Sequence, residues 1–84
     1  MLTIIREDLP VSSGLKESMA GYAGVNLQTG NAMIEKLAMQ EQEKIGGALV
    51  VTNELDIDPN RTVHVATVLD KNKVPVCRYY GKWE

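Results

Sequence analysis

Hydrophobic and β-branched residues gather in four short segments that read as strands. Leu2 to Ile5 is a short apolar run, closed by three charged residues and by Pro10. Three later segments are rich in valine, threonine and leucine and predict further strands: Ala48 to Leu55, Thr62 to Leu69 and Val74 to Tyr80. The polar residues Asp70 to Lys73 predict a hairpin turn between the last two strands.

Two other segments show helical periodicity. With Ser12 or Ser13 as an N-cap, apolar residues recur at i, i+4, i+7 and i+8 before Gly24, at Leu15, Met19, Tyr22 and Ala23. In the second segment Thr29 is the expected N-cap and Gly46 ends the helix. Its apolar stripe consists of Met33, Ile34, Leu37, Ala38 and Ile45. The polar run Gln40 to Lys44 is expected to face solvent.

These elements predict an α+β fold, in which two helices pack on one face of a three- to four-stranded antiparallel sheet in the order β-α-α-β-β-β. Residues 1–84 form a single compact domain in this interpretation. A turn centred on Lys71 and Asn72 places Leu69 opposite Val74 and Ala66 opposite Cys77. We expect the helices to cover Val63, Val65, Thr67, Leu69, Val74, Val76 and Tyr80. The opposite face then carries His64, Ala66, Val68, Pro75, Cys77 and Tyr79.

An antiparallel sheet covered on one side usually shows polar residues on the other. The second face instead carries Ala66, Val68, Pro75 and Cys77, so we expect a partner to cover it. A chain of 84 residues also has a small core, made here without phenylalanine. We therefore expect a homo-oligomer, joined through this face or through the C-terminal strand.

Aromatic residues are concentrated at the C-terminus, where Tyr79, Tyr80 and Trp83 are three of only four in the chain. Tyrosine, tryptophan and arginine dominate protein interfaces. The sequence predicts a non-catalytic protein-binding module, an inhibitor, adaptor or accessory subunit of the size and composition that phages and mobile elements encode. Its predicted partner-binding residues are Tyr79, Trp83, Arg78, Lys82, Val68, Ala66 and Cys77.

A nucleic-acid-binding module is the alternative. The stretch MAGYAGVNL contains a GxxG between two expected helices, and in this it resembles the KH domain of RNA-binding proteins, whose GxxG loop clamps the nucleic-acid backbone. The middle positions lack Lys or Arg, and three strands follow where that family would have two strands and a helix. The residues of this alternative site are Gly21, Tyr22, Gly24, Lys71 and Lys73, supported by the basic and aromatic C-terminus.

Catalytic and metal chemistry find little support. His64 and Cys77 are diagonal neighbours in the expected register, but a reactive thiolate also needs an orienting group and an oxyanion site. Asp56, Asp58 and Asn60 are spaced like the start of a calcium loop, whereas the glycine and the bidentate glutamate of that loop are missing. We predict no catalytic residue, metal or cofactor.

The net charge and the single cysteine limit the expected partners and the expected cellular compartment. A net charge of −2 with both signs dispersed gives no overall attraction to nucleic acid or to a membrane surface. Cys77 is the only cysteine, which excludes an internal disulfide and suits a reducing compartment. No signal-peptide core or membrane span is recognisable, so a cytoplasmic protein is expected.

Overall fold

The computed structural model describes residues 1–10, 15–55 and 62–83. Five strands and one helix follow one another as β1 (Leu2–Asp8), β2 (Lys16–Tyr22), α1 (Leu27–Ile45), β3 (Ala48–Leu55), β4 (Thr62–Leu69) and β5 (Pro75–Trp83). The α+β class and the antiparallel sheet are confirmed. The expected element list is wrong in detail, because one helix and five strands stand where two helices and three to four strands were predicted.

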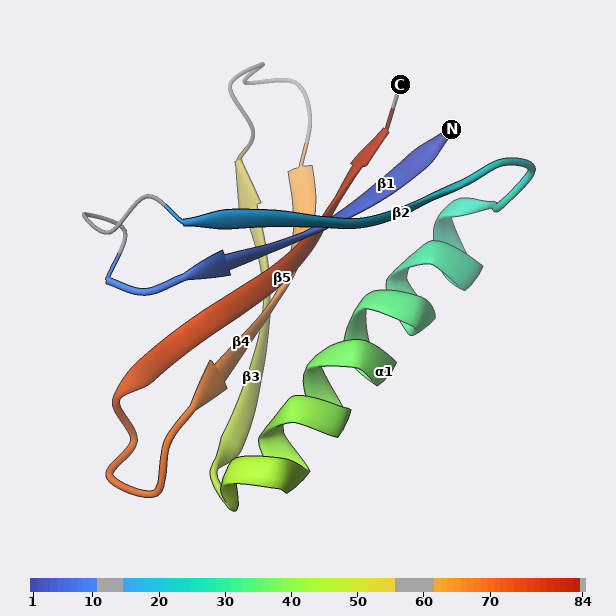
Figure 1. The fold of residues 1–84 in the computed structure, drawn as a ribbon. Helices are drawn as coiled ribbons and strands as arrows, with labels where there is room; N and C mark the ends of the chain where they lie inside the picture. The colour runs from blue at the N-terminus through green and yellow to red at the C-terminus, as the bar shows by residue number, and fades with distance from the viewer. Residues whose placement is uncertain (11–14, 56–61, 84) are drawn as a thin grey trace.

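The five strands form one antiparallel sheet in the order β2-β1-β5-β4-β3, and α1 lies along one side of it (Figure 1). The first and last strands of the chain are therefore neighbours at the centre of the sheet. Since β5 is flanked by β1 and β4, the C-terminal strand offers no edge to a second molecule. In this topology β5 cannot pair edge to edge with a strand of a second molecule, so an association of that form through the C-terminal strand is excluded.

The first expected helix is a strand. Residues Lys16–Tyr22 form β2 and pair with β1, with an irregularity in register between Ile4 and Ile5. Glycine is unfavourable within a helix by about 1 kcal/mol relative to alanine, and Gly21 lies inside this segment. Pairing with β1 satisfies the backbone of both strands, and this tertiary gain overrides the apolar spacing that suggested a helix.

The second expected helix is confirmed, with a different start. Its N-cap is Asn26, whose side-chain oxygen accepts a hydrogen bond of 2.8 Å from the backbone N–H of Thr29. Thr29, the expected N-cap, is therefore already helical. The helix ends as predicted at Gly46, which adopts a left-handed conformation with φ of 66°.

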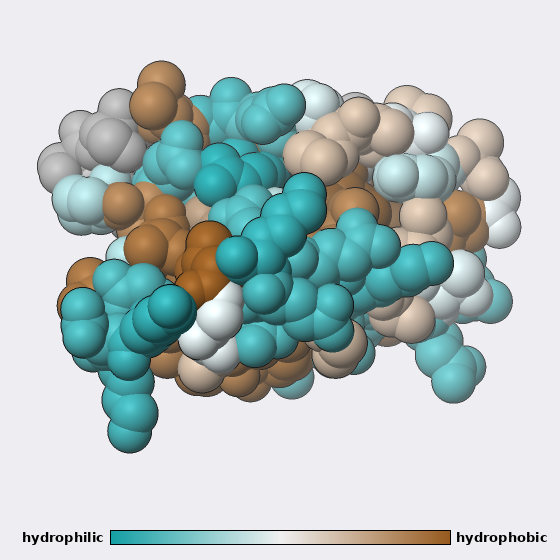
Figure 2. All heavy atoms as spheres, turned by 60° about the horizontal axis from the view of Figure 1, so that its bottom comes forward, coloured by the Kyte–Doolittle hydropathy of each residue, from teal (hydrophilic) through white to brown (hydrophobic). Residues whose placement is uncertain are grey.

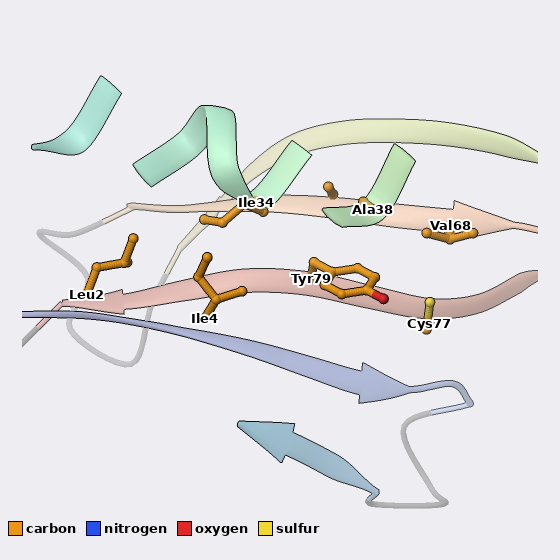
Figure 3. Close-up of a cluster of buried hydrophobic side chains, with 8 residues drawn as sticks. Leu2, Ile4, Ile34, Ala38, Val68, Cys77 and Tyr79 are labelled. Carbon is orange, nitrogen blue, oxygen red and sulfur yellow. The ribbon is translucent and has the colours of Figure 1, made fainter. Parts of the chain in front are cut away.

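The helix covers the sheet face opposite to the one expected. In β4 and β5, Val65 pairs with Tyr80 and Val68 with Cys77, a shift of two residues from the expected register. One residue of the shift arises at the hairpin, where Leu69 pairs with Pro75 instead of Val74, and the irregularity between Val68 and Leu69 adds the second. The buried core contains Leu2, Ile4, Ile34, Ala38, Ala66, Val68, Cys77 and Tyr79. Figure 3 shows the labelled side chains of the sheet pointing toward Ile34 and Ala38 of α1.

Small residues explain this choice of face. A Cβ atom added to Gly81 would lie 2.6 Å from Cδ1 of Leu2 and 2.9 Å from Cδ1 of Ile34. Ala66, Ala38 and Gly81 thus let helix and sheet approach closely. The face with the small residues is the one that the helix covers.

Several large hydrophobic side chains remain exposed, among them Val50, Val51 and Met39. Figure 2 turns the molecule so that the bottom of Figure 1 comes forward, and on this side hydrophobic residues lie between hydrophilic ones. Within the described ranges, no helix has the length and apolar character needed to cross a membrane.

Candidate functional site

A cluster of polar side chains lies between α1 and the sheet, centred on Glu41. Its carboxylate accepts two hydrogen bonds from Arg6 of β1, from Nε at 2.9 Å and from Nη2 at 3.0 Å. It also accepts one from the Cys77 thiol at 2.6 Å and one from the Tyr79 hydroxyl at 2.5 Å. A second carboxylate, that of Asp8, lies 2.6 Å from Nη1 of Arg6.

This cluster stabilises one protonation state of each group. The hydrogen bonds of Arg6 are the main reason why the pKa of Glu41 falls from 4.5 to about 2. Burial, followed by the Glu41 carboxylate, raises the pKa of the Cys77 thiol to about 12 and also raises the pKa of Tyr79. At neutral pH, Cys77 and Tyr79 are therefore neutral donors to an ionised glutamate, and the cluster attaches the helix to the sheet.

Cys77 and Tyr79 were predicted to bind a partner on an open sheet face, together with Ala66 and Val68. That placement is wrong, since Ala66, Val68 and Cys77 are fully buried and Tyr79 is 4% exposed. The alternation of side chains correctly assigned these four residues to one face of the sheet. Alternation does not show which face the helix covers, and α1 covers this one.

The proposed neighbourhood of His64 and Cys77 is also wrong. Cys77 pairs with Val68, four residues along β4 from His64, which separates the two by about 13 Å at the usual rise of a strand. The imidazole of His64 instead lies 3.0 Å from Oε1 of Glu35 and 3.3 Å from Oδ1 of Asn53. Neither ring nitrogen faces the thiol.

Trp83 lies on the helix-covered face as well. It is half-buried against the core, and a Cβ atom added to Gly30 would come within 2.9 Å of its Cζ2 atom. Trp83 thus packs where α1 crosses the end of β5. Trp83 was predicted to bind a partner, and its packing against the core explains this C-terminal aromatic residue by the fold itself.

The sheet face turned away from α1, called the outer face below, carries the other C-terminal residues. Two rows cross all five strands: Ser18, Ile5, Tyr80, Val65 and Thr52, and beside it Lys16, Glu7, Arg78, Thr67 and Val50. Tyr80, which was expected in the core, is the central residue of the first row. Two of the predicted binding residues, Arg78 and Lys82, also lie on this face.

Polar contacts order the centre of the outer face. The Glu7 carboxylate accepts hydrogen bonds from Arg78, at 3.0 Å from Nε and 2.9 Å from Nη2. Glu7 is 1% exposed, and the Arg78 guanidinium lies 5.6 Å from the centroid of the Tyr80 ring. Arg78 is thereby held in place between a carboxylate and an aromatic ring.

The residues of the nucleic-acid alternative are not brought together. Gly21 and Tyr22 end β2, and Gly24 follows in the turn before α1, so the GxxG joins a strand to a helix and not two helices. Lys71 lies at the other end of the helix, where its Cε would be 3.1 Å from a Cβ on Gly46. With a rise of 1.5 Å per residue, the two groups are about 30 Å apart.

The calcium-like residues Asp56, Asp58 and Asn60 lie outside the described residues. Among the residues that are described, no group of three or more histidine, cysteine, aspartate or glutamate side chains could hold a metal ion.

Sequence reasoning missed Glu41 and Tyr80. Glu41 belongs to a polar helix run that was expected to be solvated, and its partner Arg6 is 35 positions away. Tyr80 was assigned to the core because the wrong face was assigned to the helix. The presence of Gly81, Ala66 and Cys77 on one face was the available signal of a close helix.

Comparison of the chain with protein-family models, with curated proteins and with solved structures finds no match.

Proposed function

We propose that the protein is a non-catalytic protein-binding module, an inhibitor or adaptor, that binds its target through the outer face. The observation that carries this proposal is the sheet face without a helix: α1 is the only helix among the described residues, and it lies on the opposite side. Glu7 and Val65 are buried within this face, whereas Val50, Thr52 and Lys82 are exposed on it and can contact another molecule.

The chemistry of the outer face supports a protein target. One half, on β3 and β4, carries aliphatic and threonine side chains, of which Val50 and Thr52 are exposed, Thr67 is partly buried and Val65 is buried. Tyr80 stands between this half and the charged half on β1, β2 and β5. An aromatic residue at the centre, surrounded by small apolar contacts, is the usual arrangement of a binding hot spot.

Charge favours a target with acidic side chains at its border. The strands of this face carry three cations, Lys16, Arg78 and Lys82, and two carboxylates, Glu7 and, by its position opposite Val63, Glu54. Their charges sum to +1, whereas the chain as a whole carries −2. Such a difference steers a partner toward this side of the molecule.

Single-stranded nucleic acid is the less suitable ligand, because its binders stack successive bases on successive aromatic rings. The outer face presents one ring among its described side chains, that of Tyr80. The free thiol of Cys77 suits a reducing compartment, and we place the module in the cytoplasm.

Photo-crosslinking tests the proposal. The protein is produced in cells of the organism that encodes it, with benzoylphenylalanine in place of Lys82, which is exposed on the outer face. In a matched control, benzoylphenylalanine replaces the exposed Lys36 of α1. Adducts are identified by mass spectrometry. We expect a protein adduct from position 82 and none of the same mass from position 36.

The captured protein is then purified and its Kd is measured. Tyr80→Ala and Lys82→Glu should each weaken binding by about tenfold or more, while Lys36→Glu leaves it unchanged. Circular dichroism verifies that each variant is folded. A protein adduct from position 36 alone would overturn the proposal, and crosslinked RNA or DNA at position 82 would favour the nucleic-acid alternative.

A further inference from the structure

The sheet has two edges, β2 and β3, and they differ in how they are protected. Edge strands of soluble proteins are commonly protected by bulges, lysines or short length. β2 begins with Lys16 and pairs irregularly with β1. β3 runs over eight residues in unbroken register with β4, and residues 48–53 contain no charge and no proline.

Exposed apolar side chains line this second edge on both faces of the sheet. Val50 points to the outer face and is 43% exposed, and Val51 points to the helix side and is 42% exposed. Met39 of α1 is 49% exposed. It lies one turn after Glu35, which contacts His64 of β4, so Met39 is on the flank of the helix that faces β4 and β3.

We propose that β3 pairs antiparallel with β3 of a second copy, so that two five-stranded sheets become one continuous sheet. Directly opposite residues in antiparallel strands point to the same face. A twofold axis that keeps both helices on one side must therefore relate one residue to the same residue of the second copy, so that this residue pairs with itself across the axis. With the axis at Val51, each Val51 faces Val51 of the second copy, and Val50 faces its Thr52.

A second copy is the occupant that fits this edge. With the axis at Val51, the pairing sets Val51 against Val51 and Val50 against Thr52, places Leu49 opposite Asn53, and brings no like charges together within residues 48–53. It also places both helices on one side of the joined sheet, so that Val51 and Met39 meet their counterparts near the axis. The inference is independent of the proposed function, because it uses the edge and leaves the outer face open.

Charge complementation at position 51 tests this register. Light scattering and sedimentation should find the unmodified protein to be a dimer at micromolar concentration. Val51→Lys and Val51→Glu should each weaken the dimer by about fivefold or more, since like charges then face each other across the axis. An equimolar mixture of the two variants should dimerise again, because lysine then faces glutamate.

A control and an independent measurement complete the test. Met19→Lys places the same charge on an exposed hydrophobic residue of the other edge and should leave the dimer intact. In hydrogen exchange of the unmodified protein, amides of β3 should gain protection with rising concentration, and those of β2 should not. A monomer at high concentration, or dissociation by Met19→Lys but not by Val51→Lys, would overturn the proposal. A monomer that captures extended peptides along β3 would show a different occupant and would also overturn it.

Discussion

Replacing Glu41 by glutamine removes the charge on which the cluster between α1 and the sheet depends. The side chain keeps its size, but one of its two acceptor oxygens becomes an NH₂ donor. Arg6 then loses its ionised partner on the helix. Cys77 and Tyr79, each of which donates to a different carboxylate oxygen, can no longer both find an acceptor.

The shift in pKa gives the size of the effect. The pKa of Glu41 is about 2 in the folded protein, against an ordinary 4.5, and one pKa unit corresponds to about 1.4 kcal/mol. The ionised carboxylate therefore stabilises the fold by about 3 kcal/mol at neutral pH. Breaking a fully buried, hydrogen-bonded pair from one side costs about 3 to 5 kcal/mol. The side chains of Arg6 and Glu41 are 23% and 21% exposed, so solvent screening places this pair at the lower end of that range or below it. This is a large share of the stability of a small domain, about 5 to 15 kcal/mol.

The pH dependence has a definite sign. A lowered pKa means that the stabilisation is fully present above the unfolded value of 4.5 and is lost as the pH falls toward 2. The unmodified protein should lose about 3 kcal/mol more than Glu41→Gln over this range. Because the other carboxylates titrate in both proteins, the difference between the two curves isolates Glu41.

Urea unfolding, followed by the fluorescence of Trp83, measures both effects. At neutral pH, Glu41→Gln should lower the unfolding midpoint by about 2 to 3 M. Glu43→Gln, at an exposed position of the same helix, is the matched control and should leave the midpoint almost unchanged. Equal midpoints for the two variants, or parallel pH curves for Glu41→Gln and the unmodified protein, would refute the role assigned to Glu41.

Two further predictions concern the core. Cys77 is fully buried and its pKa is raised to about 12, so a thiol reagent should label it only at the rate of unfolding, and stability should fall as the pH rises above 9 because the unfolded chain releases the thiol proton first. Immediate labelling of the folded protein would contradict this. Gly30→Ala should lower the free energy of unfolding by about 1 to 3 kcal/mol, because the new Cβ would lie 2.8 Å from Leu2 and 2.9 Å from Trp83. Alanine ordinarily stabilises a helix relative to glycine, so a raised melting temperature would show that the contact is absent.

Local patterns predicted the parts of the fold that local interactions decide. The stripe from Met33 to Ile45 and the stop at Gly46 gave the helix and its end, and the β-branched segments gave β3 and β4 with their observed bounds. β2 was missed because its conformation depends on pairing with β1, which the seven residues of β2 do not encode by themselves.

The candidate site was harder, because alternation groups residues by face without showing which face is covered. Ala66, Cys77 and Tyr79 were grouped correctly, but their apolar character was taken as a sign of a partner when it reflects burial under α1. The attachment of Glu41 to Arg6 joins distant parts of the chain, and a charged residue in a helix carries no local mark of such a contact.

The central pairing of β1 with β5 constrains how the protein folds during synthesis. Glu7 and Arg78, which bond across these strands, are 71 positions apart, so their contact forms only after β5 has left the ribosome. Until then β1 has β2 as its one neighbouring strand, and Leu2 and Ile4, fully buried in the finished protein, lack their covering. Contacts of such long range slow folding. Closure of the sheet should therefore be a late step that follows the synthesis of β5, and chains arrested before β5 should expose apolar surface that chaperones bind.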